Sequence, residues 1–342
     1  MATLGTTALT LADWAKRLDP DGKVPVVAEL LSQSNEVLED AIFMEGNLPT
    51  GHRVTIRTGL PAVYWRSINQ GVPGSKSTTA QVDEAIGMLE AYSKVDVDLA
   101  SLNGNTSQFR LSEDSAFLEA MNQTQAGTLI YGNPATDPRQ YLGLAPRYSA
   151  IAAAPGNQQN ILSGGGAGSA NTSIYLVVWG ENTVFCTFPK GSKAGLLHED
   201  QGQLTVYDGA SNPFQALQTH YQWKNGLVVK DWRYVVRICN IDTAVFAGMS
   251  GTQAVTAVAT NILHLMTRAL DRIPNMKMGR PAFYMNRSVF SLLRRIAMEK
   301  SVAALALQQG FDQFGTAANW STFEGVPLRR VDQILNTEST IS

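Results

Sequence analysis

Residues 51–80 read GHRVTIRTGLPAVYWRSINQGVPGSKSTTA, and this stretch decides the fold. Residues 53–57 alternate polar and apolar side chains, as a β-strand does, and residues 58–61 (TGLP) are typical of a turn before further alternation. Residues 69–79, with their glycines and proline, predict a loop tip, and residues 80–94 predict an extended return. The stretch has no acidic residue and four basic ones: Arg53, Arg57, Arg66 and Lys76.

The segments on either side of this basic ribbon are acidic. Residues 1–50 carry three Lys/Arg and eight Asp/Glu, a net charge of −5. Residues 81–122 carry two bases and eight acids, a net of −6, whereas residues 51–80 have a net of +4. A basic ribbon of this kind is suited to an acidic surface. If the ribbon folds back, that surface is on its own subunit; if it reaches another copy, the protein forms a lattice.

The composition describes a globular chain with few charges. It has 342 residues, a net charge of −2, 44% hydrophobic residues and 16% charged residues, which allows about two domains and an ample core. Such a chain buries its apolar surface in a larger core or against partners. No apolar run approaches the ~18 residues that span a bilayer, and no signal-peptide pattern is present. We therefore expect cytoplasmic assembly and no membrane partner.

The N-terminal half predicts two helices. Pro25 suits the first turn of a helix, and apolar residues at helical spacing continue it to about residue 44. Ser112 suits the N-cap of a second helix that runs to about Tyr131, because Glu113 and Asp114 would then lie in its first turn.

The second half predicts mixed strands and helices, so the fold class is α+β. A buried strand at 174–179 turns at 180–182 into another strand at 183–188, and Asn225-Gly226 predicts a hairpin turn. The other predicted elements are strands at 203–207, 214–223 and 227–239, a helix at 252–271, a strand at 281–286, a helix at 287–300, and strands near 302–308 and 326–334.

Motifs that resemble catalytic or cofactor sites fail on inspection. Residues 71–77 (GVPGSKS) lack the glycine before lysine that a phosphate-binding loop needs. The glycine-rich residues 163–168 precede a strand, whereas a dinucleotide loop follows one. The four histidines are scattered, and Cys186 and Cys239 lie in apolar runs typical of buried thiols. We expect no catalytic, cofactor or metal site.

Three stretches resemble a known protein family. They are residues 45–53 (EGNLPTGHR) leading into residues 58–61, residues 143–148 (GLAPRY), and residues 323–332 (FEGVPLRRVD). With the order of the predicted elements, the chain resembles the major capsid proteins of tailed bacteriophages, with the Hong-Kong-97-type fold, and a podophage-like subgroup among them.

The resemblance implies a set of structural parts. The hairpin becomes an extended loop, the E-loop, and the second helix becomes a spine helix at about 112–131. The implied parts are an N-terminal arm with a helix (1–48), the E-loop (49–94), a peripheral domain with the spine helix (95–140), an axial domain (141–225), a long peripheral strand (226–249), a second axial segment (250–320) and a C-terminal return to the peripheral domain (321–342).

From the charge pattern we expect the E-loop to contact a neighbouring subunit, with arginine forks binding carboxylates and Trp65 as an apolar anchor. The predicted E-loop contacts are Arg53, Arg57, Tyr64, Trp65, Arg66 and Lys76. The predicted acidic partners are Glu36, Glu39, Asp40, Glu113, Asp114 and Glu119.

The implied function is a subunit that self-assembles, as hexamers and pentamers, into an icosahedral shell around double-stranded DNA. It would be part of the virion and assemble in the host bacterial cytoplasm. The basic span 268–300 suggests non-specific DNA contacts, with Arg294 and Arg295 as candidates. Portal and decoration proteins are further expected partners. The chain has no long helical leader before the arm, which suggests a separate scaffolding protein or none.

The resemblance leaves alternatives open. No position matches the residues that form covalent cross-links in some members, so we expect no cross-link. An encapsulin-like compartment has the same fold but would enclose protein cargo. An α+β enzyme with an unrecognised site would show a cleft with convergent titratable residues. A decoration or tail protein is a third alternative, which the order of spine helix and E-loop disfavours.

Overall fold

The computed structural model describes residues 32–102, 106–151, 156–208, 211–243, 252–298, 305–311 and 317–342. Its centre is strand β6 (Asn171–Trp179), whose residues are all buried. Ile174, Leu176 and Val178 face one hydrophobic core, and the residues between them face another. A strand covered on both faces has a continuous apolar sequence, so the predicted buried strand at 174–179 is confirmed.

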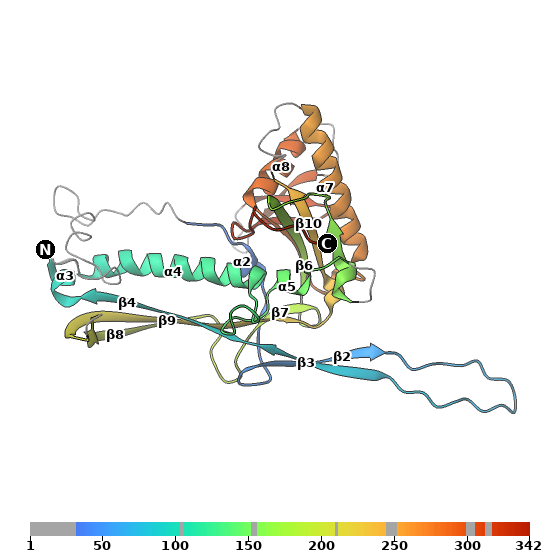
Figure 1. Ribbon diagram of the computed structural model, residues 1–342, viewed down its shortest axis with the longest axis horizontal. Helices are drawn as coiled ribbons and strands as arrows, with labels where there is room; N and C mark the ends of the chain where they lie inside the picture. Colours follow the sequence, from blue (N-terminus) through green and yellow to red (C-terminus); the bar gives the residue numbers. More distant parts are fainter. Residues whose placement is uncertain are drawn as a thin grey trace.

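The other elements of the central body surround β6 (Figure 1). In chain order they are α2 (Val37–Asp40), β1 (Phe43–Glu45), α5 (Leu144–Arg147), η2 (Asn157–Asn160), β5 (Ile161–Ser163), β7 (Val184–Phe188), η3 (Trp232–Tyr234), β10 (Val235–Asp242), α7 (Thr252–Arg272), η4 (Met276–Met278), β11 (Arg280–Met285), α8 (Arg287–Met298), β12 (Leu305–Phe311), β13 (Ala317–Phe323) and β14 (Val326–Arg330).

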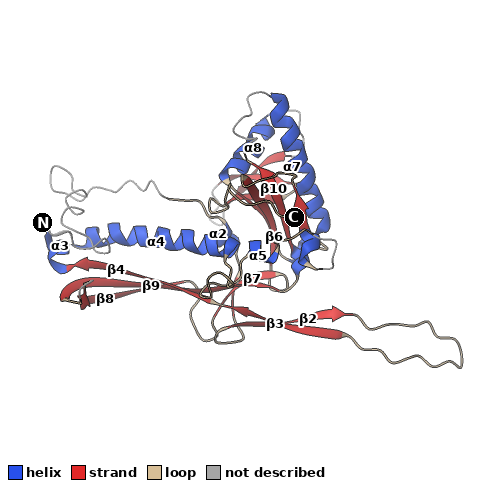
Figure 2. Ribbon diagram, viewed as in Figure 1, coloured by secondary structure: helices blue, strands red, loops and turns tan. Residues whose placement is uncertain are grey.

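The sheet path runs β12-β13-β14-β11-β6-β7-β9-β4, in which β9 is Pro213–Val229 and β4 is Gly87–Asp96. Strand β10 also pairs with β6, antiparallel. Helices α7 and α8 cover one face, where Met266 and Leu292 are fully buried. The second core contains residues of α2, α5 and the last turns of α4 (Thr106–Tyr131), including Val37, Leu144 and Leu129. Figure 2 shows α7 and α8 on the side of the sheet away from α4.

An elongated arm leaves this body. Its long helix α4 (Thr106–Tyr131) lies along strands β4 (Gly87–Asp96), β9 (Pro213–Val229) and β8 (Leu196–Tyr207), as Figure 1 shows. The short helix α3 (Val97–Ser101) closes the far end, where a small core of Val95, Leu99, Ala100 and Phe109 lies. No helix among the described residues is long and apolar enough to cross a membrane.

A two-stranded ribbon projects from the body in the opposite direction to the arm (Figure 1). Strands β2 (Gly51–Gly59) and β3 (Thr78–Ala85) pair antiparallel, with Arg53 opposite Asp83 and Arg57 opposite Thr79. Residues 60–77, called the tip below, contain no strand. The alternation after residues 58–61 predicted a further strand, and that strand does not form. Residues 60–77 pair with no other described strand.

Two predicted helices have different bounds. Of the helix predicted from Pro25 to residue 44, only Val37–Asp40 is helical among the described residues, and Phe43–Glu45 is a strand because it pairs parallel with β7; residues 25–31 lie outside the described part. The spine helix begins at Thr106, so Ser112 is inside the helix and is not its N-cap. Packing of Phe109 on the core beneath α3 explains the added N-terminal turn.

The predicted hairpin turn at Asn225-Gly226 is wrong. Both residues lie inside β9, which exchanges partners there: Asn225 pairs with Gly87 of β4, and Gly226 pairs with Thr187 of β7. Because neighbours occupy both sides of this segment, pairing overrides the local turn tendency. The long strand is therefore Pro213–Val229, followed by β10, in place of separate strands at 214–223 and 227–239. Strand β13 was not predicted.

Candidate inter-subunit contact surfaces

The root of the ribbon is built into the body. Val54 is 5% exposed and packs against Phe185 and Val228. The carboxylate of Glu84 accepts hydrogen bonds from both terminal nitrogens of Arg147, each at 2.6 Å. These two side chains are 7% and 9% exposed. The ribbon is therefore tied to the subunit at one end only.

At the root, an exposed ion pair bridges the two strands. Arg53 Nε and Nη2 donate to the two carboxylate oxygens of Asp83 at 2.6 and 2.7 Å. The Arg53 guanidinium holds the pKa of Asp83 below its usual range. Arg53, a predicted contact with a neighbour, thus has its partner within the same ribbon.

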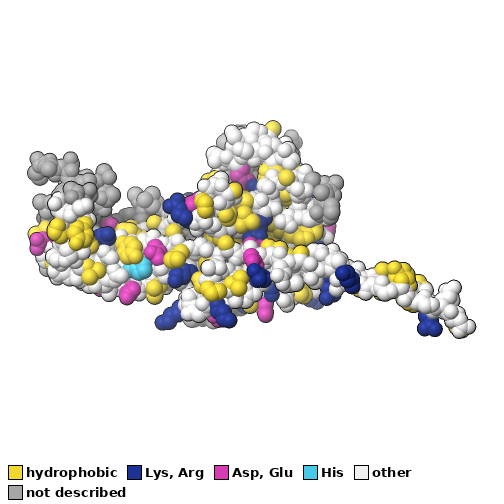
Figure 3. Space-filling model, turned by 60° about the horizontal axis from the view of Figure 1, so that its bottom comes forward, with side chains coloured by type: hydrophobic (Ala, Val, Ile, Leu, Met, Phe, Trp, Pro, Cys, Tyr) yellow, Lys and Arg dark blue, Asp and Glu magenta, His cyan; other side chains and the backbone are white. Residues whose placement is uncertain are grey.

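The tip carries an apolar surface that nothing in the described part of the subunit covers. Trp65 is fully exposed, and Val63 and Ile68 are 90% and 89% exposed. Arg66 and Lys76 are exposed on the same segment and form no ion pair with described residues. Figure 3 shows the yellow patch and dark-blue side chains together on the projecting ribbon. An exposed apolar patch of this kind marks an interaction site.

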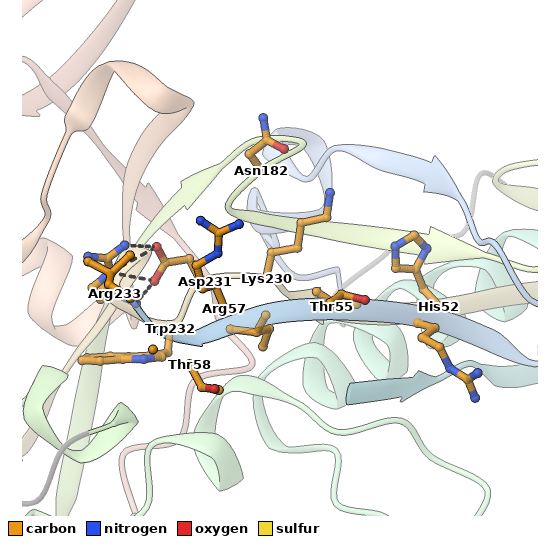
Figure 4. Close-up of a pocket in the computed structure, with 14 residues that line it drawn as sticks. His52, Thr55, Arg57, Thr58, Asn182, Lys230, Asp231, Trp232 and Arg233 are labelled. Carbon is orange, nitrogen blue, oxygen red and sulfur yellow. Dashed lines mark hydrogen bonds and ion pairs between the residues drawn. The ribbon is translucent and has the colours of Figure 1, made fainter. Parts of the chain in front are cut away.

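A groove of about 920 Å³ runs between β2 and the turn at residues 230–233. Arg57 and Lys230 point to the same side of β2, toward the turn that carries Asn182 (Figure 4). Arg233 is held by Asp231, with Nη2 and Oδ2 2.7 Å apart, whereas no ion pair to Arg57 or Lys230 occurs within the described residues. The groove therefore presents positive charge at the root of the ribbon.

His52 lies at the inner end of the groove. Its ring lies perpendicular to that of Phe185, with ring centroids 5.3 Å apart. Burial, and after it the positive charge of Lys230, lower the pKa of His52, while Glu84 acts in the opposite direction. His52 is therefore held toward its neutral form.

Two predicted acidic partners are engaged within the subunit. The Asp40 carboxylate accepts hydrogen bonds from Nε and Nη2 of Arg329, both at 3.0 Å, and from the Tyr284 hydroxyl at 3.0 Å. Glu36 lies 3.7 Å from Arg329 Nη1, and burial raises the pKa of Glu36 although Arg329 lowers it. These acids bind the C-terminal strand β14 and are not a free surface.

The other four acids lie in different settings. Glu119 accepts hydrogen bonds from the Gln33 backbone and the Gln123 side chain. Asp114 is partly buried and interacts with Tyr221. Glu113 is partly buried near the start of α4, and Glu39 is exposed on α2. The structure therefore does not bring the six predicted acids into one surface.

The predicted DNA-facing residues lie on α8. The Arg294 side chain is exposed, whereas that of Arg295 lies outside the described residues.

Sequence reasoning missed the pair that anchors the ribbon. Glu84 and Arg147 are separated by 63 residues. A partial signal was present, because Arg147 belongs to the GLAPRY stretch on which the family resemblance rests. In that stretch Leu144 is buried, Tyr148 donates to the Trp232 carbonyl at 2.8 Å, and Arg147 reaches the ribbon.

The comparison with protein families gives one match over almost the whole chain. Residues 19–342 match the family described as major capsid protein GP7. No curated protein matches.

Several solved phage structures are also similar to this chain. A chain in a structure of bacteriophage Epsilon15 is similar, with a TM-score of 0.74 and 30% sequence identity, covering 100% of this chain and 99% of that one. The capsid of bacteriophage JBD30 is 9% identical with a TM-score of 0.45, covering 92% and 99%. The capsid of a native GTA particle is 10% identical with a TM-score of 0.46, covering 69% and 99%.

Proposed function

The chain belongs to the major capsid protein GP7 family, and from that premise we propose how its surfaces hold a shell together. It is a structural, non-enzymatic subunit of a bacteriophage capsid, it self-assembles into an icosahedral shell, and its place is the virion. The predicted α+β, Hong-Kong-97-type fold is confirmed. The comparisons support neither the encapsulin-like compartment nor the enzyme.

We propose that the ribbon binds a neighbouring subunit through its tip. The observation that carries this is the exposure of Val63, Trp65 and Ile68 on a segment with no covering partner in its own described chain. A two-stranded ribbon alone is only marginally stable in water, so a neighbour that buries the tip also orders it. Trp65 is the anchor, because buried aromatic residues dominate interface energetics.

The basic side chains that bind the neighbour in this contact are Arg57, Arg66 and Lys76. Arg53 has a smaller part than we expected, because Asp83 already binds it. On the receiving subunit, the exposed Glu39 is a better candidate than Glu36 and Asp40, which Arg329 engages. Tyr64, which is 52% exposed, adds apolar area at the tip.

The division into E-loop, peripheral and axial domains is part of the proposal. Strand β9 pairs with both β4 and β8 beside α4. This supports grouping β8 and β9 with the spine helix, although we expected most of their residues in the axial domain at 141–225. Helices α7 and α8, with the sheet face that they cover, form the axial part.

A phage capsid also encloses a genome and contacts other virion proteins. We infer that the shell assembles in the host bacterial cytoplasm, encloses double-stranded DNA and meets portal, scaffolding and decoration proteins. The exposed Arg294 on α8 supports a sequence-independent contact with phosphates.

The experiment is assembly of the full chain, with and without a candidate scaffolding protein, imaged by negative-stain electron microscopy. Wild-type protein should give closed shells or regular capsomers. Trp65→Ala should reduce the shell yield about tenfold or more, since an anchor residue contributes about 2 kcal/mol or more. Its thermal unfolding as a free subunit should not change.

Ser67→Ala is the matched control, because Ser67 is exposed on the same tip but adds almost no apolar area. It should assemble as wild type does. Normal shells from Trp65→Ala would exclude the tip as an anchor.

A further inference from the structure

The place where the ribbon leaves the body is a close junction of several chain segments. Strand β3 ends at Ala85 and β4 begins at Gly87, so only Ile86 separates the ribbon from the sheet of the arm. The Ile86 amide donates to the Thr50 carbonyl at 3.2 Å. Without further contacts, rotation about these few bonds would swing the whole ribbon.

Two glycines show how tightly the segments pack there. A Cβ on Gly226 would lie 2.7 Å from the Ala85 carbonyl oxygen, and one on Gly51 would overlap the Glu84 carbonyl oxygen. Strands β2, β3 and β9 therefore touch backbone to backbone at the junction. This contact limits sliding of the strands past one another, but it constrains the direction of the ribbon only weakly.

Val54 packs β2 against Phe185 and Val228, and a second side chain holds the direction of β3. Arg147 donates to both carboxylate oxygens of Glu84 on β3, to the Leu227 carbonyl of β9 at 3.1 Å and to the Leu142 carbonyl at 3.2 Å. A planar guanidinium that binds a carboxylate with two parallel hydrogen bonds fixes orientation as well as distance. The pair is buried, so water does not compete for it.

We propose that the Glu84–Arg147 pair is a positioning clamp, which fixes the direction of the ribbon and thereby the place where the tip meets the neighbouring subunit. The importance of that place rests on the proposed function of the tip; the clamp itself does not. A buried ion pair of purely structural value would affect stability without changing the spread of ribbon directions, and this difference makes the proposal testable.

The test measures a distance within the subunit by double electron–electron resonance. Spin labels are placed at Ala80→Cys on the paired strand β3 and Ala116→Cys on α4, both of which are exposed positions. The native Cys186 and Cys239 are buried and stay unlabelled. The full-length chain is measured before shell assembly and diluted with unlabelled chain, so that only distances within one subunit contribute.

Wild-type protein should give a narrow distance distribution. Glu84→Gln should broaden it at least about twofold, because local freedom rises when buried contacts are lost. The matched control is Asp83→Asn, which removes the same charge from the adjacent, exposed residue of the same strand and should leave the distribution narrow.

A second variant separates the clamp from misfolding. Glu84→Gln combined with Arg147→Met leaves no unpaired buried charge, and it should give a broad distribution with unchanged hydrogen exchange in β6. A narrow distribution in this variant, or a broad one already in wild type, would overturn the clamp. Failure of the tip contact would show instead as normal shells from Trp65→Ala, with the distances unaffected.

Discussion

Arg53 on β2 lies directly across from Asp83 on β3, and its guanidinium binds both carboxylate oxygens at 2.6 and 2.7 Å. Arg57, further out on the same strand, lies opposite Thr79 and forms no ion pair within the described residues. The sequence alone treats the two arginines as equivalent contacts with a neighbour. Their cross-strand partners assign Arg53 to the ribbon itself and leave Arg57 available at the groove.

The two arginines should therefore respond differently to mutation. Arg57→Glu places a negative charge beside Lys230 in a basic groove, so we expect loss of shell assembly with a folded free subunit. Arg53→Gln removes an exposed pair, which contributes little, and should assemble. Sedimentation velocity of both variants, before and after assembly is triggered, makes the comparison. Equal loss of assembly in both would show that the cross-strand pair does not separate their roles.

Acid should weaken the root of the ribbon through His52. Its pKa is lowered from 6.5, first by burial and then by Lys230. The unfolded chain therefore binds more protons as the pH falls through about 6.5, and stability declines from there down to the lower folded pKa. Urea unfolding at about pH 7.5 and about pH 5 should show a larger loss for wild type than for His52→Gln. Parallel losses in the two proteins would contradict this role.

The two cysteines should be unreactive in the folded subunit. Burial raises the pKa of Cys186 to about 12 and that of Cys239 to about 11. The thiolate is the reactive form, so a thiol reagent at about pH 8 should label neither residue in folded protein and both after denaturation. Labelling of one cysteine in native subunits but not in shells would instead indicate an opening that assembly closes.

The sequence predicted elements well where a local pattern coincided with burial. The run from Ile174 to Trp179 is apolar throughout because cores lie on both of its faces, and this pattern identified β6. The alternation of Arg53–Arg57 identified β2 in the same way. The charge segregation predicted that the ribbon is basic, although not which arginine would be paired.

The errors arose where distant partners decide the structure. Asn225-Gly226 favours a turn locally, but β4 and β7 pair with this segment and hold it extended. Residues 43–45 continue a helical pattern, yet they pair with β7. The six acids were predicted together because they lie in the two acidic segments that flank the ribbon. Only the fold shows that Arg329, on the last strand, engages Glu36 and Asp40.

The C-terminal segment should be a major source of stability, through Glu338. Its carboxylate accepts hydrogen bonds from Arg237 at 2.9 Å, from the Tyr131 hydroxyl at 2.5 Å and from Ser173. The Arg237 and Glu338 side chains are only 5% and 7% exposed. Removing one partner of a buried ion pair leaves an uncompensated charge, so Glu338→Ala should lower the free energy of unfolding by about 3–5 kcal/mol.

Urea unfolding of unassembled subunits measures this loss, with Glu181→Ala as the control. Glu181 is exposed in the turn between β6 and β7, and its substitution should change stability by less than about 0.5 kcal/mol. Arg237→Met combined with Glu338→Leu should recover part of the loss, because neither charge is then left buried alone. If Glu338→Ala lowers the free energy of unfolding by less than about 1 kcal/mol, water reaches Arg237. The C-terminal segment would then not be a major source of stability.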